Sequence, residues 1–107
     1  MMNAIFCFIM EWVVYILFSK ELNRYYTGCT SAIDERLKKH AEIFYGNRGF
    51  TAKASDWELC YQISCSGEWQ AKCIEQHIKS MKSRVYIENL IRYPEITVRL
   101  LEKYKNC

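Results

Sequence analysis

Basic and hydroxyl side chains between residues 36 and 53 have the composition of a phosphate-binding surface. Arg36 and His40 are four residues apart in a segment with helical periodicity, so they share one face of the predicted helix. From that face, Arg36 could hold a phosphate through two parallel hydrogen bonds. Arg48, Thr51 and Lys53 lie in the following loop and suit contacts with phosphate oxygens. The alternative is an ordinary exposed surface on which Arg36 pairs with a nearby acid.

The positive charge of the chain is concentrated in two segments. The 107 residues carry a net charge of only +3, which by itself indicates no partner. Residues 36–53 contain five basic residues and one acid, and residues 72–84 contain four basic residues and one acid, so the remaining residues together carry −4. Such segments attract polyanions, including nucleic acid, although lysines and arginines also simply solvate helix faces.

Length and composition fit one compact domain with its own core. Half of the residues are hydrophobic and 25% are charged, which is ordinary for a soluble domain. The apolar residues 1–10 lack the basic start of a signal peptide and are too short for a membrane helix. We expect them to be an N-terminal extension, either from an upstream start codon or as a short packed element, and we expect no membrane association.

Three strands are predicted from runs of apolar and aromatic residues. The first is an unbroken apolar run, the second is rich in Tyr and Thr, and the third alternates apolar with polar residues. A polar turn at residues 19–23 joins the first two into a hairpin. The predicted strands are residues 12–18, 24–30 and 57–65. In the third, Trp57, Leu59, Tyr61 and Ile63 are expected to share one face.

Two tyrosines lie within the predicted hairpin. Tyr15 shares a strand face with Leu17, and Tyr26 shares one with Gly28. If these two faces coincide, both rings point toward the helix that carries Arg36. Gly28 would then leave room for backbone or a phosphate to approach. Packing in the core would explain both rings equally well.

A later helix carries an apolar seam with an acid beside it. Apolar residues spaced by three and four run from Ala71 to Val85, which predicts one continuous seam. Glu75 is about 100° around the helix from Ile74, at the boundary between core and solvent. Taken alone, it is a surface glutamate paired with Lys79. Helix continues over residues 86–92, and Pro94 begins a last helix.

Short motifs occur in the order found in one enzyme family. The chain resembles the GIY-YIG endonuclease family over residues 11 to about 91, most closely its small single-domain branch, which is similar to the N-terminal domain of the excision-repair incision subunit. Val13 stands where the family name has glycine, and Thr27 where it has isoleucine. The motifs are Val13-Val14-Tyr15, Tyr26-Thr27-Gly28, Thr30-Ser31-x-x-x-Glu35-Arg36-Leu37, Phe50-Thr51-Ala52-Lys53 and Ala71-x-x-x-Glu75-x-x-Ile78-Lys79-Ser80.

The resemblance implies a fold and a set of site residues. The fold would be α/β (α+β), with a small central three-stranded antiparallel sheet flanked by helices in a domain of residues 11–92, and residues 93–107 would form a helix packed on it. Glu75 would hold one divalent cation, Mg²⁺ or Mn²⁺. The resemblance implies these catalytic residues: Tyr15, Tyr26, Arg36 and Glu75. The resemblance and the charge pattern together indicate these nucleic-acid contacts: His40, Arg48, Thr51, Lys53, Lys79, Lys82 and Arg84.

The six cysteines suggest a competing arrangement. Cys60, Cys65, Cys73 and His77 could be considered as zinc ligands, but their spacing matches none of the usual paired-ligand patterns. Cys60 and Cys65 are an odd number of residues apart, so they point to opposite faces of a regular strand. We therefore expect reduced cysteines and no structural zinc.

Three classes of function remain open. The first is a metal-dependent endonuclease that hydrolyses DNA phosphodiester bonds, on branched or damaged DNA as in DNA repair, with a cytoplasmic location. The second is a nucleic-acid-binding module of the same fold that needs a protein partner for specificity or for cutting. The third is an interaction domain in which the tyrosines and Glu75 only pack. Loss of cutting with retained binding in a Glu75 variant separates the first two classes, and salt-dependent DNA binding separates the second from the third.

Overall fold

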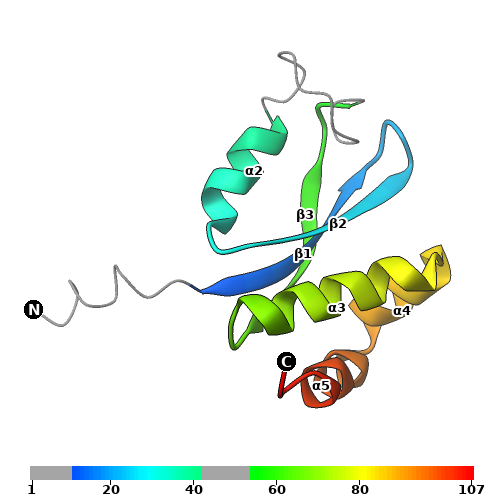
Figure 1. Ribbon diagram of the computed structural model, residues 1–107. Coiled ribbons are helices and arrows are strands. Elements are labelled where there is room, and N and C mark those ends of the chain that lie inside the picture. Colours follow the sequence, from blue (N-terminus) through cyan, green and yellow to red (C-terminus); the bar gives the residue numbers. More distant parts are fainter. Residues whose placement is uncertain (1–10, 42–53) are drawn as a thin grey trace, which may run out of the picture.

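A three-stranded antiparallel sheet forms the centre of the fold. The computed structural model describes residues 11–41 and 54–107, with the backbone alone for 39–41. The strands follow the order β2-β1-β3 in the sheet, and helices lie on both of its sides (Figure 1). The predicted fold class is confirmed. The elements are β1 (Trp12–Ser19), β2 (Arg24–Thr30), α2 (Ile33–Ala41), β3 (Glu58–Cys65), α3 (Glu68–Met81), α4 (Arg84–Arg92) and α5 (Pro94–Lys103).

One face of the sheet carries the main hydrophobic core. Val14 and Ile16 of β1 and Ile63 of β3 are buried on this face, where α3 runs along the sheet (Figure 1). α4 and α5 lie on the same side and add Leu90 and Leu100 to the cluster. From α3 the core receives Ala71, Ile74 and Ile78. Since side chains alternate along a strand, Tyr15 and Leu17 must lie on the opposite face.

A bulge in β3 breaks the alternation expected for that strand. Ile16 of β1 pairs with Tyr61, but the next residue, Leu17, pairs with Leu59, so Cys60 is an extra residue. Leu59 therefore lies on the face opposite Tyr61, and the expectation that Trp57, Leu59, Tyr61 and Ile63 share one face is wrong. The ring of Trp57 instead lies 6.4 Å from that of Tyr26.

The predicted seam from Ala71 to Val85 is interrupted between two helices. Lys82 adopts the left-handed conformation at φ 47° and ends α3. The Ser83 side chain then accepts a hydrogen bond from the Tyr86 backbone N–H at 3.0 Å, which caps the first turn of α4. Val85 is consequently 63% exposed and does not extend the seam. Pro94 begins α5, as predicted.

Within residues 11–41 and 54–107, none of the helices combines the length and the apolar content that crossing a bilayer requires.

Candidate active site

Tyr15 and Tyr26 lie on the same face of the sheet, on neighbouring strands. The β1–β2 register pairs Tyr15 with Gly28 and Leu17 with Tyr26, and residues that pair across antiparallel strands share a face. The centroids of the two phenol rings are 6.3 Å apart, with an interplanar angle of 45°. The structure therefore brings together the two tyrosines of the hairpin motifs.

The ring of Tyr15 fills the space that Gly28 leaves open. A Cβ atom on Gly28 would lie 2.6 Å from the Tyr15 hydroxyl oxygen and 2.7 Å from its Cζ. We expected this glycine to let backbone or a phosphate approach, but the side chain of Tyr15 takes that room. Glycine at this position therefore determines how Tyr15 lies across β2.

Arg36 of α2 reaches the hydroxyl group of Tyr15. Burial of the phenol raises the pKa of Tyr15 to about 12, helped by the charges of Tyr26 and Glu75 and opposed by hydrogen bonding and charge from Arg36. Tyr15 is therefore a neutral phenol at physiological pH. In this state it can orient a water molecule or relay a proton, but it is not an ionised base.

The raised pKa of Tyr15 makes stability depend on alkaline pH. The native state keeps the phenolic proton up to about pH 12, whereas an unfolded tyrosine loses it near 10.0. Between these values the native state binds more protons than the unfolded state, so stability falls as pH rises. We expect urea titrations at about pH 8 and about pH 11 to show a smaller loss of unfolding free energy in Tyr15→Phe than in wild type. Equal losses in both proteins would contradict the burial of this phenol.

Glu75 lies on α3 at the edge of the core, with its side chain 15% exposed. Its Oε1 accepts a hydrogen bond from Cys29 Sγ at 3.3 Å, and its Oε2 lies 2.9 Å from Lys79 Nζ. Burial first, and then the bond to Glu75, raise the pKa of Cys29 to about 12. The thiol thus stays protonated and donates to the carboxylate. Cys29 escaped the sequence analysis, although its place next to Gly28 on β2 predicts a side chain that faces α3.

Four predicted catalytic residues converge on β2, which is an edge strand. Tyr15 and Tyr26 lie on one face of the hairpin, Arg36 approaches from α2, and Glu75 approaches from α3 on the other side. Tyr26, Arg36 and Glu75 all influence the pKa of the Tyr15 hydroxyl group, so the four side chains belong to one site. A phosphate at this edge would meet a cation, phenols and a carboxylate together.

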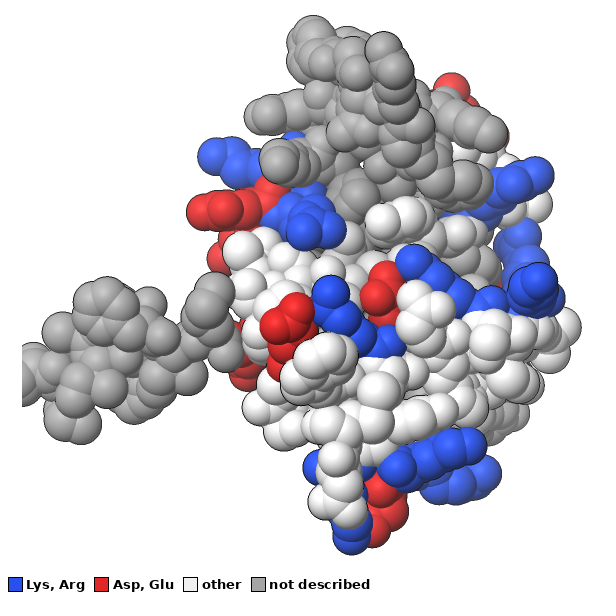
Figure 2. Space-filling model, in the orientation of Figure 1, with Lys and Arg blue, Asp and Glu red and all other residues white. Residues whose placement is uncertain are grey.

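A groove with two of the predicted lysines runs beside this site. It has a volume of about 300 Å³ and lies between β2 and the junction of α3 with α4. Tyr26 and Thr27 line one side, and Lys79 and Lys82 line the other. Blue basic side chains alternate with red acidic ones across the middle of the molecular surface, where α3 runs (Figure 2). The position and charge of the groove suit a phosphate backbone that leads away from the site.

Arg84 binds the hairpin turn rather than the site. Its Nη1 and Nη2 donate to the backbone and side-chain oxygens of Asn23, each at 3.0 Å, and its Nε donates to Glu88. The guanidinium also lies 5.3 Å from the Tyr25 ring centroid. Asn23 is the left-handed residue of the turn, at φ 56°. Arg84 therefore joins α4 to the β1–β2 hairpin, and its contact with nucleic acid stays a prediction.

A pair of substitutions separates these two roles. Arg84→Met should lower the unfolding free energy by about 1–2 kcal/mol, because the turn loses charged hydrogen bonds and a cation–π contact that are partly exposed. Lys82→Met, next to the groove, should change stability less and weaken DNA binding more. Urea denaturation and DNA titrations at fixed salt measure both effects. If Arg84→Met instead weakened DNA binding more than Lys82→Met and left stability nearly unchanged, Arg84 would be chiefly a DNA contact.

Some of the predicted nucleic-acid contacts lie outside the part of the chain that the structure describes. Arg48, Thr51 and Lys53 lie outside the described residues, and so does the side chain of His40.

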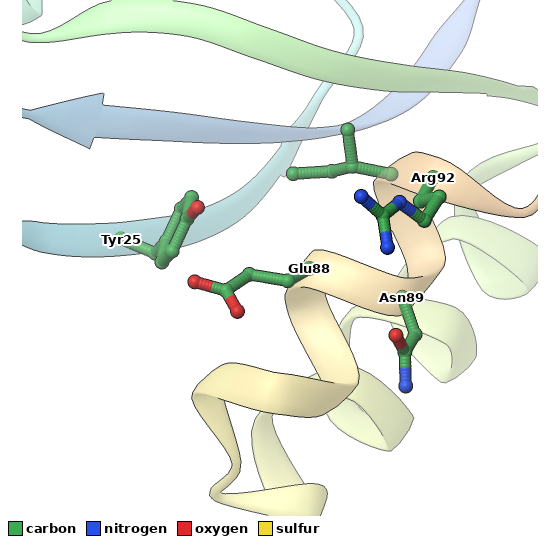
Figure 3. Close-up of a pocket in the computed structure, with 5 residues that line it drawn as sticks. Tyr25, Glu88, Asn89 and Arg92 are labelled. Carbon is green, nitrogen blue, oxygen red and sulfur yellow. The ribbon is translucent and has the colours of Figure 1, made fainter.

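Another pocket, of about 410 Å³, lies beside Tyr25 and is lined by Glu88, Asn89, Ile91 and Arg92 of α4 (Figure 3). Tyr25 packs against the core cluster, so this pocket opens on the face opposite Tyr15 and Tyr26.

The cysteines considered for zinc have other partners. Among the described residues, no group of three or more His, Cys, Asp or Glu side chains is placed to hold a metal. Cys60 Sγ donates to the Ile16 carbonyl oxygen at 3.3 Å. His77 Nδ1 is hydrogen-bonded to the Tyr104 hydroxyl group at 2.8 Å, and burial followed by the charge of Lys103 lowers the pKa of His77.

A family match indicates that the fold is of the nuclease type. Residues 11–88 match the family model described as the GIY-YIG catalytic domain. The chain therefore belongs to the GIY-YIG family, as its motifs predicted. A search of curated proteins and a search of solved structures each gave no match.

Proposed function

We propose that this protein is a metal-dependent endonuclease that hydrolyses phosphodiester bonds in DNA. The observation that carries the proposal is the convergence at the β2 edge, where the Tyr15 hydroxyl group lies over Gly28, Arg36 reaches that hydroxyl group, and Glu75 binds Cys29 next to Gly28. A cation for the phosphate, a hydroxyl group for the water and a carboxylate for a metal are the groups that this hydrolysis needs. The family membership supports the same reaction.

The residues of the site divide the work of hydrolysis. A bond forms between the water oxygen and phosphorus, and the bond to the 3′ oxygen breaks. Arg36 neutralises the non-bridging oxygens as negative charge develops on them. The Tyr15 phenol accepts a hydrogen bond from the attacking water and takes its proton while passing its own proton to solvent water, and the leaving 3′ oxygen takes a proton from solvent. Tyr26, whose ring lies 6.3 Å away, supports the position of Tyr15. This relay suits a tyrosine whose pKa is raised to about 12, because no tyrosinate has to form beforehand.

Glu75 would hold the cation. A carboxylate is a hard oxygen ligand of the kind that Mg²⁺ and Mn²⁺ prefer. The described residues offer no cluster of three ligands, and Mg²⁺ is commonly held by one or two carboxylates with water and substrate phosphate completing its shell. The donor set therefore fits one such ion. When bound, it supplies stabilisation of charge on the leaving oxygen.

A second candidate is a nucleic-acid-binding module that cuts only with a partner protein. The observation that favours it is the occupied carboxylate of Glu75, which binds both Cys29 and Lys79. Lys79 would have to release Glu75 before a cation could bind. A partner or the substrate itself could drive this change, since the ammonium group of Lys79 can move to a phosphate in the adjoining groove.

The deciding experiment is cleavage of labelled single-stranded, duplex and branched DNA with Mg²⁺, with Mn²⁺ and with a chelator. Cutting only with metal supports the endonuclease. Binding without cutting favours the partner-dependent module, and neither binding nor cutting contradicts both. A preference for branched or damaged DNA would support a role in repair, which the resemblance to the N-terminal domain of the excision-repair incision subunit suggests.

A further inference from the structure

Trp69 is the most exposed large apolar side chain among the described residues. It lies in the first turn of α3 and is 71% exposed, while its neighbours Gln70 and Ala71 are buried. The indole therefore projects away from the core and adds little to its packing. Tryptophan is strongly enriched in the binding surfaces of proteins, so an exposed indole beside a candidate site points to a ligand.

Two lysines, each paired with a glutamate of the same helix, and a glutamine follow Trp69 on α3. Lys72, Gln76 and Lys79 follow it at intervals of three and four residues, which place them along one side of the helix. The charges of Lys72 and Lys79 both act on Cys29, the residue that donates to Glu75. The two lysines thus border the candidate active site, and Trp69 lies about one turn further toward the N-terminus of α3. Trp69 is roughly 9 Å from Glu75 along the helix axis, or about three stacked nucleotide steps of 3.4 Å.

The charge of this stripe favours nucleic acid over a protein as the occupant. The cores of protein interfaces are depleted of charged residues, whereas lysines beside an aromatic ring are the pattern of single-strand binding surfaces. The ion pair between Lys72 and Glu68 is 3.4 Å long and about half exposed. Such a pair contributes little and can give way to a phosphate.

We propose that Trp69 is a stacking platform for an unpaired base, with Lys72 and Lys79 on the adjoining phosphates. This inference rests on the proposed function and narrows its substrate to DNA with a single-stranded segment beside the cleaved bond. An unpaired base offers its ring face to the indole, whereas a base within a duplex is already stacked on its neighbours. The groove lined by Lys79 and Lys82 would receive the strand on the other side of Glu75.

The test compares Trp69→Ala and Trp69→Phe with wild type in binding to labelled oligothymidine and to a blunt duplex, at fixed salt and with a chelator present. Trp69→Ala should bind oligothymidine about tenfold more weakly, with duplex affinity changed much less. Trp69→Phe should bind nearly as wild type does. Val98→Ala, at an exposed apolar position on α5, is the matched control and should change neither affinity. Tryptophan emission should be quenched by oligothymidine more in wild type than in Trp69→Phe.

Each other outcome overturns the platform. Unchanged oligothymidine affinity in Trp69→Ala would do so, and so would equal losses for single-stranded and duplex DNA. Concentration-dependent dimerisation that Trp69→Ala abolishes, without an effect on DNA, would assign the indole to a second copy of the chain. The two proposals can fail independently. If the wild-type protein cuts DNA but Trp69→Ala binds oligothymidine as tightly as wild type does, the nuclease proposal stands and the platform is excluded. A protein that stacks bases but never cuts has the platform without the nuclease.

Discussion

Replacing Glu75 with glutamine should reduce metal-dependent cutting by about 10³-fold, since loss of a metal's charge stabilisation costs several kcal/mol in the transition state. Glutamine has nearly the same shape, so its amide oxygen can still accept the hydrogen bond from Cys29. It loses the negative charge that a hard cation needs. Folding should be preserved, because the side chain lies at the edge of the core and not within it.

Glu68→Gln is the matched control for this substitution. Glu68 lies on the same helix and pairs with Lys72 at four residues' distance, as Glu75 pairs with Lys79, but it is half exposed. Glu68→Gln should cut as wild type does. DNA binding measured with a chelator should persist in both variants. Glu75→Gln that still cuts at the wild-type rate would exclude this residue as the metal ligand, and loss of binding together with cutting would point to a structural role.

Gly28→Ala should damage both stability and activity. The new Cβ would lie 2.6 Å from the Tyr15 hydroxyl oxygen, so either the ring or the strand must move. Overpacking of this kind typically costs about 1–3 kcal/mol. Displacement of Tyr15 by about 1 Å should also cost about 10²-fold in cutting, because the reaction depends on alignment. Urea denaturation and single-turnover cleavage measure the two effects separately.

Gly67→Ala provides the comparison for Gly28→Ala. Gly67 is extended at φ −179° and has no atom within 4 Å of its built Cβ. Alanine there weakens only a helix cap, so stability should fall slightly and cutting should remain near the wild-type rate. If Gly28→Ala were as active and as stable as Gly67→Ala, Tyr15 would not occupy the space above Gly28 in solution.

The arrangement of the tyrosines could be predicted because it follows from local rules. Strand parity places Tyr15 with Leu17 and Tyr26 with Gly28, and a short hairpin turn leaves little freedom in the pairing. The border position of Glu75 likewise follows from helix geometry. What strand parity could not supply was the direction of the Tyr15 ring across β2, since this depends on packing between strands.

The features that escaped prediction depend on contacts between distant parts of the chain. The extra residue Cys60 in β3 has no signature in an alternating sequence, because a bulge is decided by pairing with β1. The break after α3 places a lysine in a left-handed conformation, which lysine disfavours. Arg84 looked like a free basic residue until the fold placed it against Asn23, which is 61 positions away.

The site residues differ in how far apart they lie along the chain. Tyr15, Tyr26, Gly28 and Arg36 come from a hairpin and the helix directly after it, all within a short stretch of chain. Glu75 comes from much further along the sequence, on a helix whose core residues pack with those of β1 and β3. Because local contacts close shorter loops than distant ones, we expect the contacts around Tyr15 to form before those of Glu75.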